Sequence, residues 1–181
     1  MSENGDSDHT DKEWLEHDCI KPMRPDPKVQ VVMCDGSPVT DDHKEIKDNG
    51  QQKGYVALSD EERAKGFVRP VREAYVHVGK EAPKYPLRDL TESEKARYSC
   101  VGFVRYEKYP SGSDTIGKFW TQDDLNKVGK GCGVRTVMAL PLAETYARDP
   151  SFYSGTFCVG CGTHLPVDEF LWEGTEERVG S

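Results

Sequence analysis

Three residues near the end of the chain carry side chains that can bind a metal or do redox chemistry. Cys158, Cys161 and His164 lie within GTFCVGCGTHLPVDEFLW, residues 155–172. Two thiolates fit one tetrahedral metal site when a tight turn brings their sulfur atoms to about 3.7 Å from each other. Gly162 favours such a turn, because glycine adopts positive φ without strain. The segment therefore predicts a metal-binding turn, and zinc is the metal we expect.

A tetrahedral site needs two further ligands, and the sequence offers one clear candidate for the third. Cys132 stands in GKGCG, residues 129–133, which repeats the pairing of cysteine with glycine. The fourth ligand is open among three residues. His77 lies in the strand-like run AYVHVG, Cys100 follows a predicted helix, and His164 would have to reach back over the turn. We rank His77 first.

Two other uses of these residues are less well supported. A redox dithiol belongs at the start of a helix, whereas Cys158 and Cys161 are followed by glycine and then by Pro166.

A catalytic zinc ion, in a hydrolase or a deaminase-like enzyme, needs an open coordination position and a nearby carboxylate. The acidic residues that the sequence offers for this role are Glu144, Asp168 and Glu169. Three thiolates make zinc a poor Lewis acid, and the proline that precedes the Cys-x-x-Cys pair in zinc deaminases is absent before Cys158. We therefore expect a structural zinc ion and no catalytic residues.

The elements that must position these ligands lie in the second and larger part of the chain. Residues 1–53 hold 13 acidic and 7 basic residues, and residues 54–181 hold 19 and 17. The first part also contains the proline-rich KPMRPDPK and only one strand-like run, residues 29–34. We therefore predict a largely flexible acidic arm over 1–53 and a folded zinc-binding domain over 54–181.

Helix-start signals recur through the predicted domain. LSDEERAKGFVR and LTESEKARYSCVGFVR form an imperfect repeat in which Ser59 or Thr91 is followed three residues later by glutamate. This spacing predicts a capping box and a short helix, followed by a strand at GFV. Thr121 predicts a third helix start, and Pro141 fits the first turn of a fourth helix. With a C-terminal hairpin, these elements predict an α+β, zinc-ribbon-like domain.

A basic strip with interleaved tyrosines favours nucleic-acid binding as an alternative function. Residues 63–108 contain 11 basic and 6 acidic residues, an arrangement typical of single-strand binding grooves. The residues that we would assign to this surface are Arg69, Arg72, Lys84, Arg88 and Arg105. The net charge of −8 argues against it.

The remaining features concern the location of the protein. The chain has no 18-residue apolar run and its acidic start does not resemble a signal peptide, so we expect a cytoplasmic protein without membrane contact. In the cytoplasm six cysteines favour metal ligation over disulfides.

Several segments together resemble a known group of proteins. YVHVG, GKFWTQDDL, GKGCG and LAETYARDPSFYSGTFCVGCGTHLPVDEFLW are similar to segments of uncharacterised small zinc-binding proteins that are common in bacteriophage and prophage genomes. The resemblance implies His77, Cys132, Cys158 and Cys161 as the zinc ligands, and it implies no activity. We expect a non-enzymatic accessory protein of this kind, with another protein as its partner.

Overall fold

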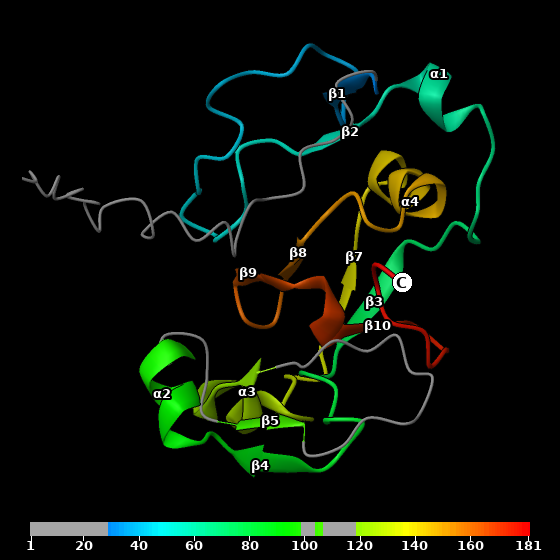
Figure 1. Cartoon of the computed structure of the whole chain (residues 1–181). Helices are drawn as coiled ribbons and strands as arrows, with labels where there is room; N and C mark the ends of the chain where they lie inside the picture. Colours follow the sequence, from blue (N-terminus) through cyan, green and yellow to red (C-terminus); the bar gives the residue numbers. More distant parts are fainter. Residues whose placement is uncertain (1–28, 99–103, 107–118) are drawn as a thin grey trace, which may run out of the picture.

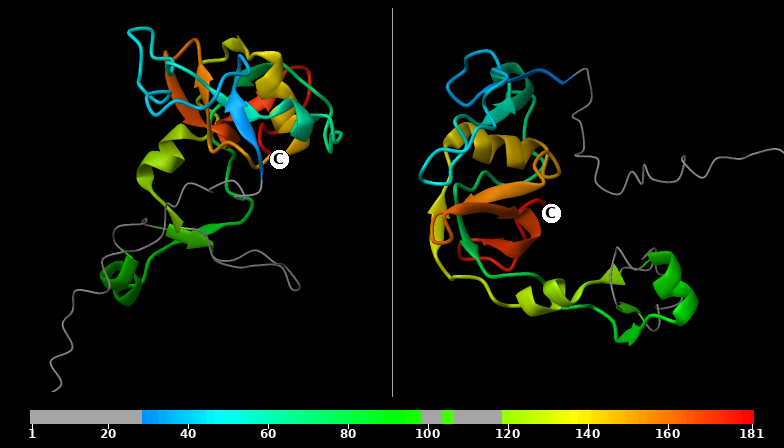
Figure 2. Two further views of the ribbon diagram at one scale, coloured as in Figure 1. Left: turned by 90° about the horizontal axis from the view of Figure 1, so that it is seen from above. Right: turned by 90° about the vertical axis from the view of Figure 1, so that its left-hand side faces the viewer.

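The chain divides into two parts that differ in size and construction. The computed structural model describes residues 29–98, 104–106 and 119–181, and in these the protein is α+β, with short helices and strands that pair antiparallel. Figure 2 shows a larger part, here called the main body, and a smaller part that stands away from it, here called the distal lobe. Helix α3, Gln122–Lys127, lies between them.

The main body contains three small sheets and two helices. Its central sheet has the strand order β10-β3-β7, and two-stranded sheets β1-β2 and β8-β9 accompany it. The strands are β1 Val31–Met33, β2 Val56–Leu58, β3 Ala74–His77, β7 Arg135–Val137, β8 Gly155–Cys158, β9 Thr163–Pro166 and β10 Phe170–Trp172. The two helices are α1 Asp60–Arg63 and α4 Leu140–Arg148, and a short 3₁₀ turn, η1, spans Val167–Glu169. Figure 2 shows α4 between the β1–β2 segment and the β8–β9 hairpin.

An aromatic cluster forms the core of the main body. Tyr75 packs edge-on against Phe170 and Trp172, with ring centroids 5.3 and 6.3 Å apart, and Trp172 also meets Tyr146 at 5.6 Å. All four are buried, together with Cys158. The core therefore joins β3, β10, α4 and β8, and one metal-binding candidate belongs to it.

The distal lobe contains a three-stranded sheet with the order β4-β5-β6 and one helix. Its elements are β4 Leu87–Asp89, α2 Glu92–Tyr98, β5 Val104–Tyr106 and β6 Phe119–Trp120. Leu90 and Trp120 are its buried hydrophobic side chains among the described residues.

The predicted helix starts are confirmed. Ser59 accepts a hydrogen bond from the Glu62 amide, although without the reciprocal bond of a capping box. Thr91 and Thr121 both form complete capping boxes, with Glu94 and Asp124 respectively. Pro141 lies in the first turn of α4 and Asp149 ends that helix, as the sequence predicts.

Two sequence expectations need adjustment. The strand expected within 29–34 forms as β1, but it pairs with β2 on the other side of the proposed boundary at residue 53. The strand expected at Phe67–Val68 does not form, and these side chains are 46% and 59% exposed. The Val68 amide instead donates to the carbonyl of Ala147 at the end of α4. The arm before residue 29 lies outside the described residues.

The helices of the described chain are all short. None of them combines the length and the apolar composition that crossing a membrane requires.

Candidate metal centre

Four side chains from three separate segments meet at one point. The ligand atoms of His77, Cys132, Cys158 and Cys161 all lie within 4.8 Å of one another. The Sγ atoms of Cys132 and Cys158 are 3.4 Å apart, and Cys161 Sγ lies 3.4 Å from His77 Nδ1. These separations match the edges of a tetrahedron around one metal ion, and a sulfur separation of 3.4 Å is far longer than a disulfide bond. The cluster can therefore hold a metal ion.

The loop before β7 brings Cys132 to His77. Strands β3 and β7 pair antiparallel, and beyond the last pair the Gly133 amide donates to the His77 carbonyl at 2.9 Å. A Cβ atom at Gly131 would overlap that same carbonyl, so no other residue fits there without movement of the backbone. The two glycines that flank Cys132 thus permit its close approach to the end of β3.

The turn of the β8–β9 hairpin brings the other two cysteines together. Cys158 ends β8, and its carbonyl accepts a hydrogen bond from the Gly162 amide at 2.8 Å. Gly162 has a φ of 64°, which supports the role the sequence predicts for it. A Cβ atom at Gly160 would lie 2.9 Å from the sulfur of Cys132. The hairpin turn therefore passes directly over the third thiol.

A buried carboxylate fixes the orientation of His77. Nε2 of His77 lies 3.3 Å from Oε2 of Glu169, and the two residues are 6% and 5% exposed. The Phe170 ring packs against the imidazole, with centroids 5.0 Å apart. Donation of the Nε2 proton to Glu169 leaves the Nδ1 lone pair facing the sulfur atoms. This is the arrangement in which an outer carboxylate orients a metal-binding histidine and strengthens it as a ligand.

The three thiols do not ionise independently. Burial acts to raise the pKa of Cys132, but hydrogen bonds from the Val134 amide, His77 and the neighbouring thiols outweigh it and lower that pKa to about 7. Burial and the neighbouring Cys158 and Cys132 raise the pKa of Cys161 to about 12. One thiolate is therefore easily formed at neutral pH, whereas three of them require a cation to balance their charge.

Of the other two candidates for the fourth ligand, His164 is described by the structure and is not part of this cluster. His164 lies on β9, where its Nε2 is 3.1 Å from the hydroxyl of Tyr55, and its ring lies beside those of Tyr55 and Phe157. Cys100 lies outside the described residues. Among the described candidates the structure therefore brings only His77 to the three cysteines.

The acidic residues considered for catalysis make contacts elsewhere in the structure. Glu144 forms an ion pair with Arg63 on α1. The backbone of Asp168 accepts a hydrogen bond from Arg178. Glu169 contacts Nε2 of His77, on the side of the imidazole away from the sulfur atoms. In the part of the chain that the structure describes, no carboxylate joins the four ligands.

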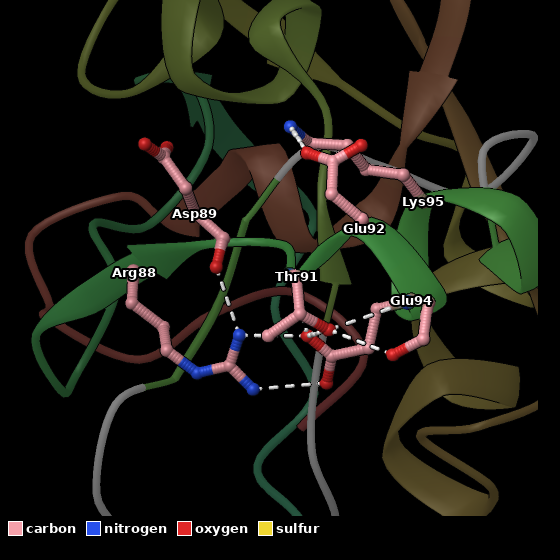
Figure 3. Close-up of polar contacts among 7 residues, drawn as sticks. Arg88, Asp89, Thr91, Glu92, Glu94 and Lys95 are labelled. Atoms are coloured by element: carbon pink, nitrogen blue, oxygen red, sulfur yellow. Dashed lines mark hydrogen bonds and ion pairs between the residues drawn. The ribbon is translucent and has the colours of Figure 1, made fainter.

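The predicted basic strip is divided between the two parts of the molecule. Arg69 and Arg72 precede β3 in the main body, where Arg72 pairs with Glu177 and Arg69 donates to the carbonyl of Ser181. Arg88 on β4 pairs with Glu94 of α2 through two hydrogen bonds, drawn in Figure 3.

Of the remaining two residues of the strip, one lies in a connecting segment and the other in the distal lobe. Lys84 lies between β3 and β4, and Arg105 on β5 lies opposite Arg88 in the register of the sheet. Arg88 and Arg105 therefore lie on the paired strands β4 and β5, whereas Arg69 and Arg72 precede β3 in the main body; Figure 1 shows these strands.

Sequence reasoning considered Glu169 only as a catalytic carboxylate and missed its contact with His77. The contact depends on the pairing of β10 with β3, in which Phe170 lies opposite His77 although 92 residues separate Glu169 from His77. No local pattern signals such a long-range pairing. Comparisons of the chain with protein-family models, with curated proteins and with solved structures give no match.

Proposed function

We propose that His77, Cys132, Cys158 and Cys161 bind one structural Zn²⁺ ion in a zinc-ribbon-like centre. The observation that carries this proposal is the meeting of one nitrogen and three sulfur atoms within 4.8 Å. Thiolate and imidazole ligands in tetrahedral positions favour zinc among the metals available in cells. The metal would join the end of β3, the loop before β7 and the β8–β9 turn.

The ligand set supports a structural role for the metal rather than a catalytic one. Four protein ligands close the coordination of zinc, so that no position is left for a reacting water molecule. Three thiolates also reduce the Lewis acidity of the ion. The carboxylate of Glu169 contacts Nε2 of His77, so its role is to orient that ligand and not to act on a bound substrate.

In this proposal the protein is a non-enzymatic accessory protein that acts through contacts with another protein. The exposed side chains of Phe67 and Val68, between α1 and β3, offer apolar area for such a contact. The resemblance to zinc-binding proteins of bacteriophages and prophages supports an origin of that kind.

Removal of the metal tests the structural role directly. Treatment of the purified protein with a chelator should abolish the dispersed NMR signals of the main body, and added Zn²⁺ should restore them. Mg²⁺ is the matched control, because it prefers oxygen ligands and should restore nothing. A chelated, metal-free protein that keeps its native spectrum would contradict the proposal.

A further inference from the structure

The three thiols of the candidate metal centre differ in how far they are exposed to solvent. Cys132 and Cys161 are exposed, whereas Cys158 is buried in the core of the main body. Gly160 lies beside the sulfur of Cys132, and a Cβ atom at this glycine would approach that sulfur to 2.9 Å. Since glycine has no side chain to cover the sulfur from that side, a small reagent in solution can reach Cys132, whereas Cys158 is sheltered.

The exposed thiol of Cys132 has a second thiol in contact with it. Its Sγ atom lies 3.4 Å from that of the buried Cys158. The other exposed thiol, Cys161, instead has Nδ1 of His77 at 3.4 Å. Redox-sensing cysteines are accessible to solvent and often lie beside a second cysteine that resolves the oxidised sulfur. Cys132 and Cys158 have the exposure and the spacing of such a pair.

We propose that the candidate metal centre is a redox-controlled zinc site, in which a hydroperoxide converts Cys132 and Cys158 into a disulfide and the metal is released. The inference rests on the proposed function, because it takes the zinc ion to be bound by this cluster. It differs from the redox dithiol considered for Cys158 and Cys161, since its two sulfur atoms come from separate segments of the chain.

The oxidation takes place in two steps, each of which forms one bond to sulfur. The Cys132 thiolate attacks one oxygen of the hydroperoxide ROOH, so that an S–O bond forms, the O–O bond breaks and the leaving oxygen takes up a proton as ROH. The Cys158 thiolate then attacks the sulfur of the resulting sulfenic acid. The S–S bond forms, the S–O bond breaks, and the leaving hydroxide takes up a proton as water. Two electrons pass from the two sulfur atoms to the peroxide, and zinc keeps its charge.

The disulfide changes which segments are joined. It leaves His77 and Cys161 as ligands, and two ligands do not complete the tetrahedral coordination of zinc. The loop before β7 stays joined to the end of β8, where the Val159 amide also donates to the Thr136 hydroxyl at 3.2 Å. The β8–β9 turn, however, loses its link to the end of β3. Oxidation should therefore speed amide hydrogen exchange at this turn and at the end of β3.

Treatment of the zinc-loaded full chain with hydrogen peroxide tests the proposal. A chromogenic chelator in the solution should report release of the zinc ion in step with formation of one disulfide per chain. Trypsin cleavage after denaturation should give the peptides 131–135 and 149–178 as one linked species that lacks two hydrogen atoms, and fragmentation should place the link between Cys132 and Cys158. A thiol reductant followed by added Zn²⁺ should restore the metal-bound protein.

Cys34→Ser is the matched control for the reacting thiol. Burial raises the pKa of Cys34 to about 11, so this thiol stays protonated, and its removal should leave the rate of zinc release unchanged. Slower release in Cys34→Ser would overturn the proposal. So would a zinc-loaded chain that keeps its metal under peroxide, a link between Cys158 and Cys161, or release with sulfinic acid and no link. Absence of zinc before peroxide is added would instead overturn the proposed function, and this inference with it.

Discussion

The main body and the distal lobe are held together by different means. In the main body an aromatic core of Tyr75, Tyr146, Phe170 and Trp172 lies directly beside the candidate metal centre, and Cys158 belongs to both. The distal lobe has a sheet of three short strands and, among the described residues, two buried hydrophobic side chains. Its helix α2 depends on the capping box of Thr91 and on the Arg88–Glu94 pair (Figure 3).

This difference indicates how small sheets reach stability within one chain. Two- and three-stranded sheets bury too little area to be stable alone. The main body compensates by joining two of its sheets, β10-β3-β7 and β8-β9, through a shared core and one ligand cluster, while β2 bonds to α4 through the Leu58 amide and the Thr145 hydroxyl. The lobe relies on local hydrogen bonds and ion pairs, which contribute about 1 kcal/mol or less each. Substitutions should therefore have large and extended effects in the main body, and small and local effects in the lobe.

The largest effect should follow from Cys158→Ser. This change removes a ligand that is also buried in the core, so the metal and the packing are lost together. A structural zinc site contributes on the order of 10 kcal/mol to folding, and we expect the Tm to fall by roughly 10 °C or more. Calorimetry and hydrogen exchange provide the measurement, with lost protection concentrated in the main body.

Cys34→Ser is the matched control for this change. Cys34 is half-buried, its pKa is raised by burial to about 11, and it is not part of the cluster. The substitution should retain the metal and lower the Tm only slightly. Equal losses in both variants would contradict a special role for the cluster.

His77→Ala should have the second-largest effect of these substitutions. It removes the nitrogen ligand, and the metal affinity should fall by more than roughly 100-fold, because loss of a ligand exceeds the effect of losing an outer partner. Competition with a chromogenic chelator measures the affinity. His164→Ala removes the Tyr55 contact and should keep the affinity. If His164→Ala lost the metal while His77→Ala kept it, His164 would be the fourth ligand. Cys100→Ala tests the remaining candidate by the same measurement.

Glu169→Gln should have an intermediate effect. The amide keeps the size of the side chain but loses the charge that orients His77 and strengthens it as a ligand. A decrease of about 10- to 100-fold in metal affinity is expected, with the fold retained. Asp168→Asn, next to it in the chain, should leave the affinity unchanged. If Glu169→Gln binds metal as the unmodified protein does, the carboxylate has only a packing role.

Thr91→Ala should have the smallest effect and one confined to the distal lobe. Loss of an N-cap costs about 1 kcal/mol, so α2 should exchange its amide protons faster while the main body keeps its metal and its protection. Glu92→Gln, which removes the exposed ion pair with Lys95, should change less. A loss of metal in Thr91→Ala would mean that the two parts are coupled more closely than their construction suggests.

Local signals in the sequence were sufficient for most elements of the fold. Ser59, Thr91, Thr121 and Pro141 each act within one helical turn, and the helices begin where these residues predict. The glycines around Cys132 and Cys161 likewise act on their own turns. This is why the sequence could suggest which cysteines meet before any strand pairing was known.

Long-range contacts could not be predicted in the same way. The pairing of β10 with β3 places Glu169 against His77, and Tyr55 reaches His164 across 109 residues of chain. Phe67 and Val68 have the composition of a strand, but the amides of Val68 and Arg69 donate to the carbonyl of Ala147 at the end of α4 instead of to a neighbouring strand. In each case the structure that forms depends on which distant segment of the chain supplies the hydrogen-bond or packing partner.

Metal content and coordination, measured on protein purified without added zinc, test the central claim most directly. Elemental analysis combined with X-ray absorption spectroscopy should give one zinc ion per chain with three sulfur neighbours and one nitrogen neighbour. Fewer sulfur neighbours together with an additional oxygen would contradict the account, because an open site would indicate a catalytic metal. Protein that folds without any metal would contradict it as well.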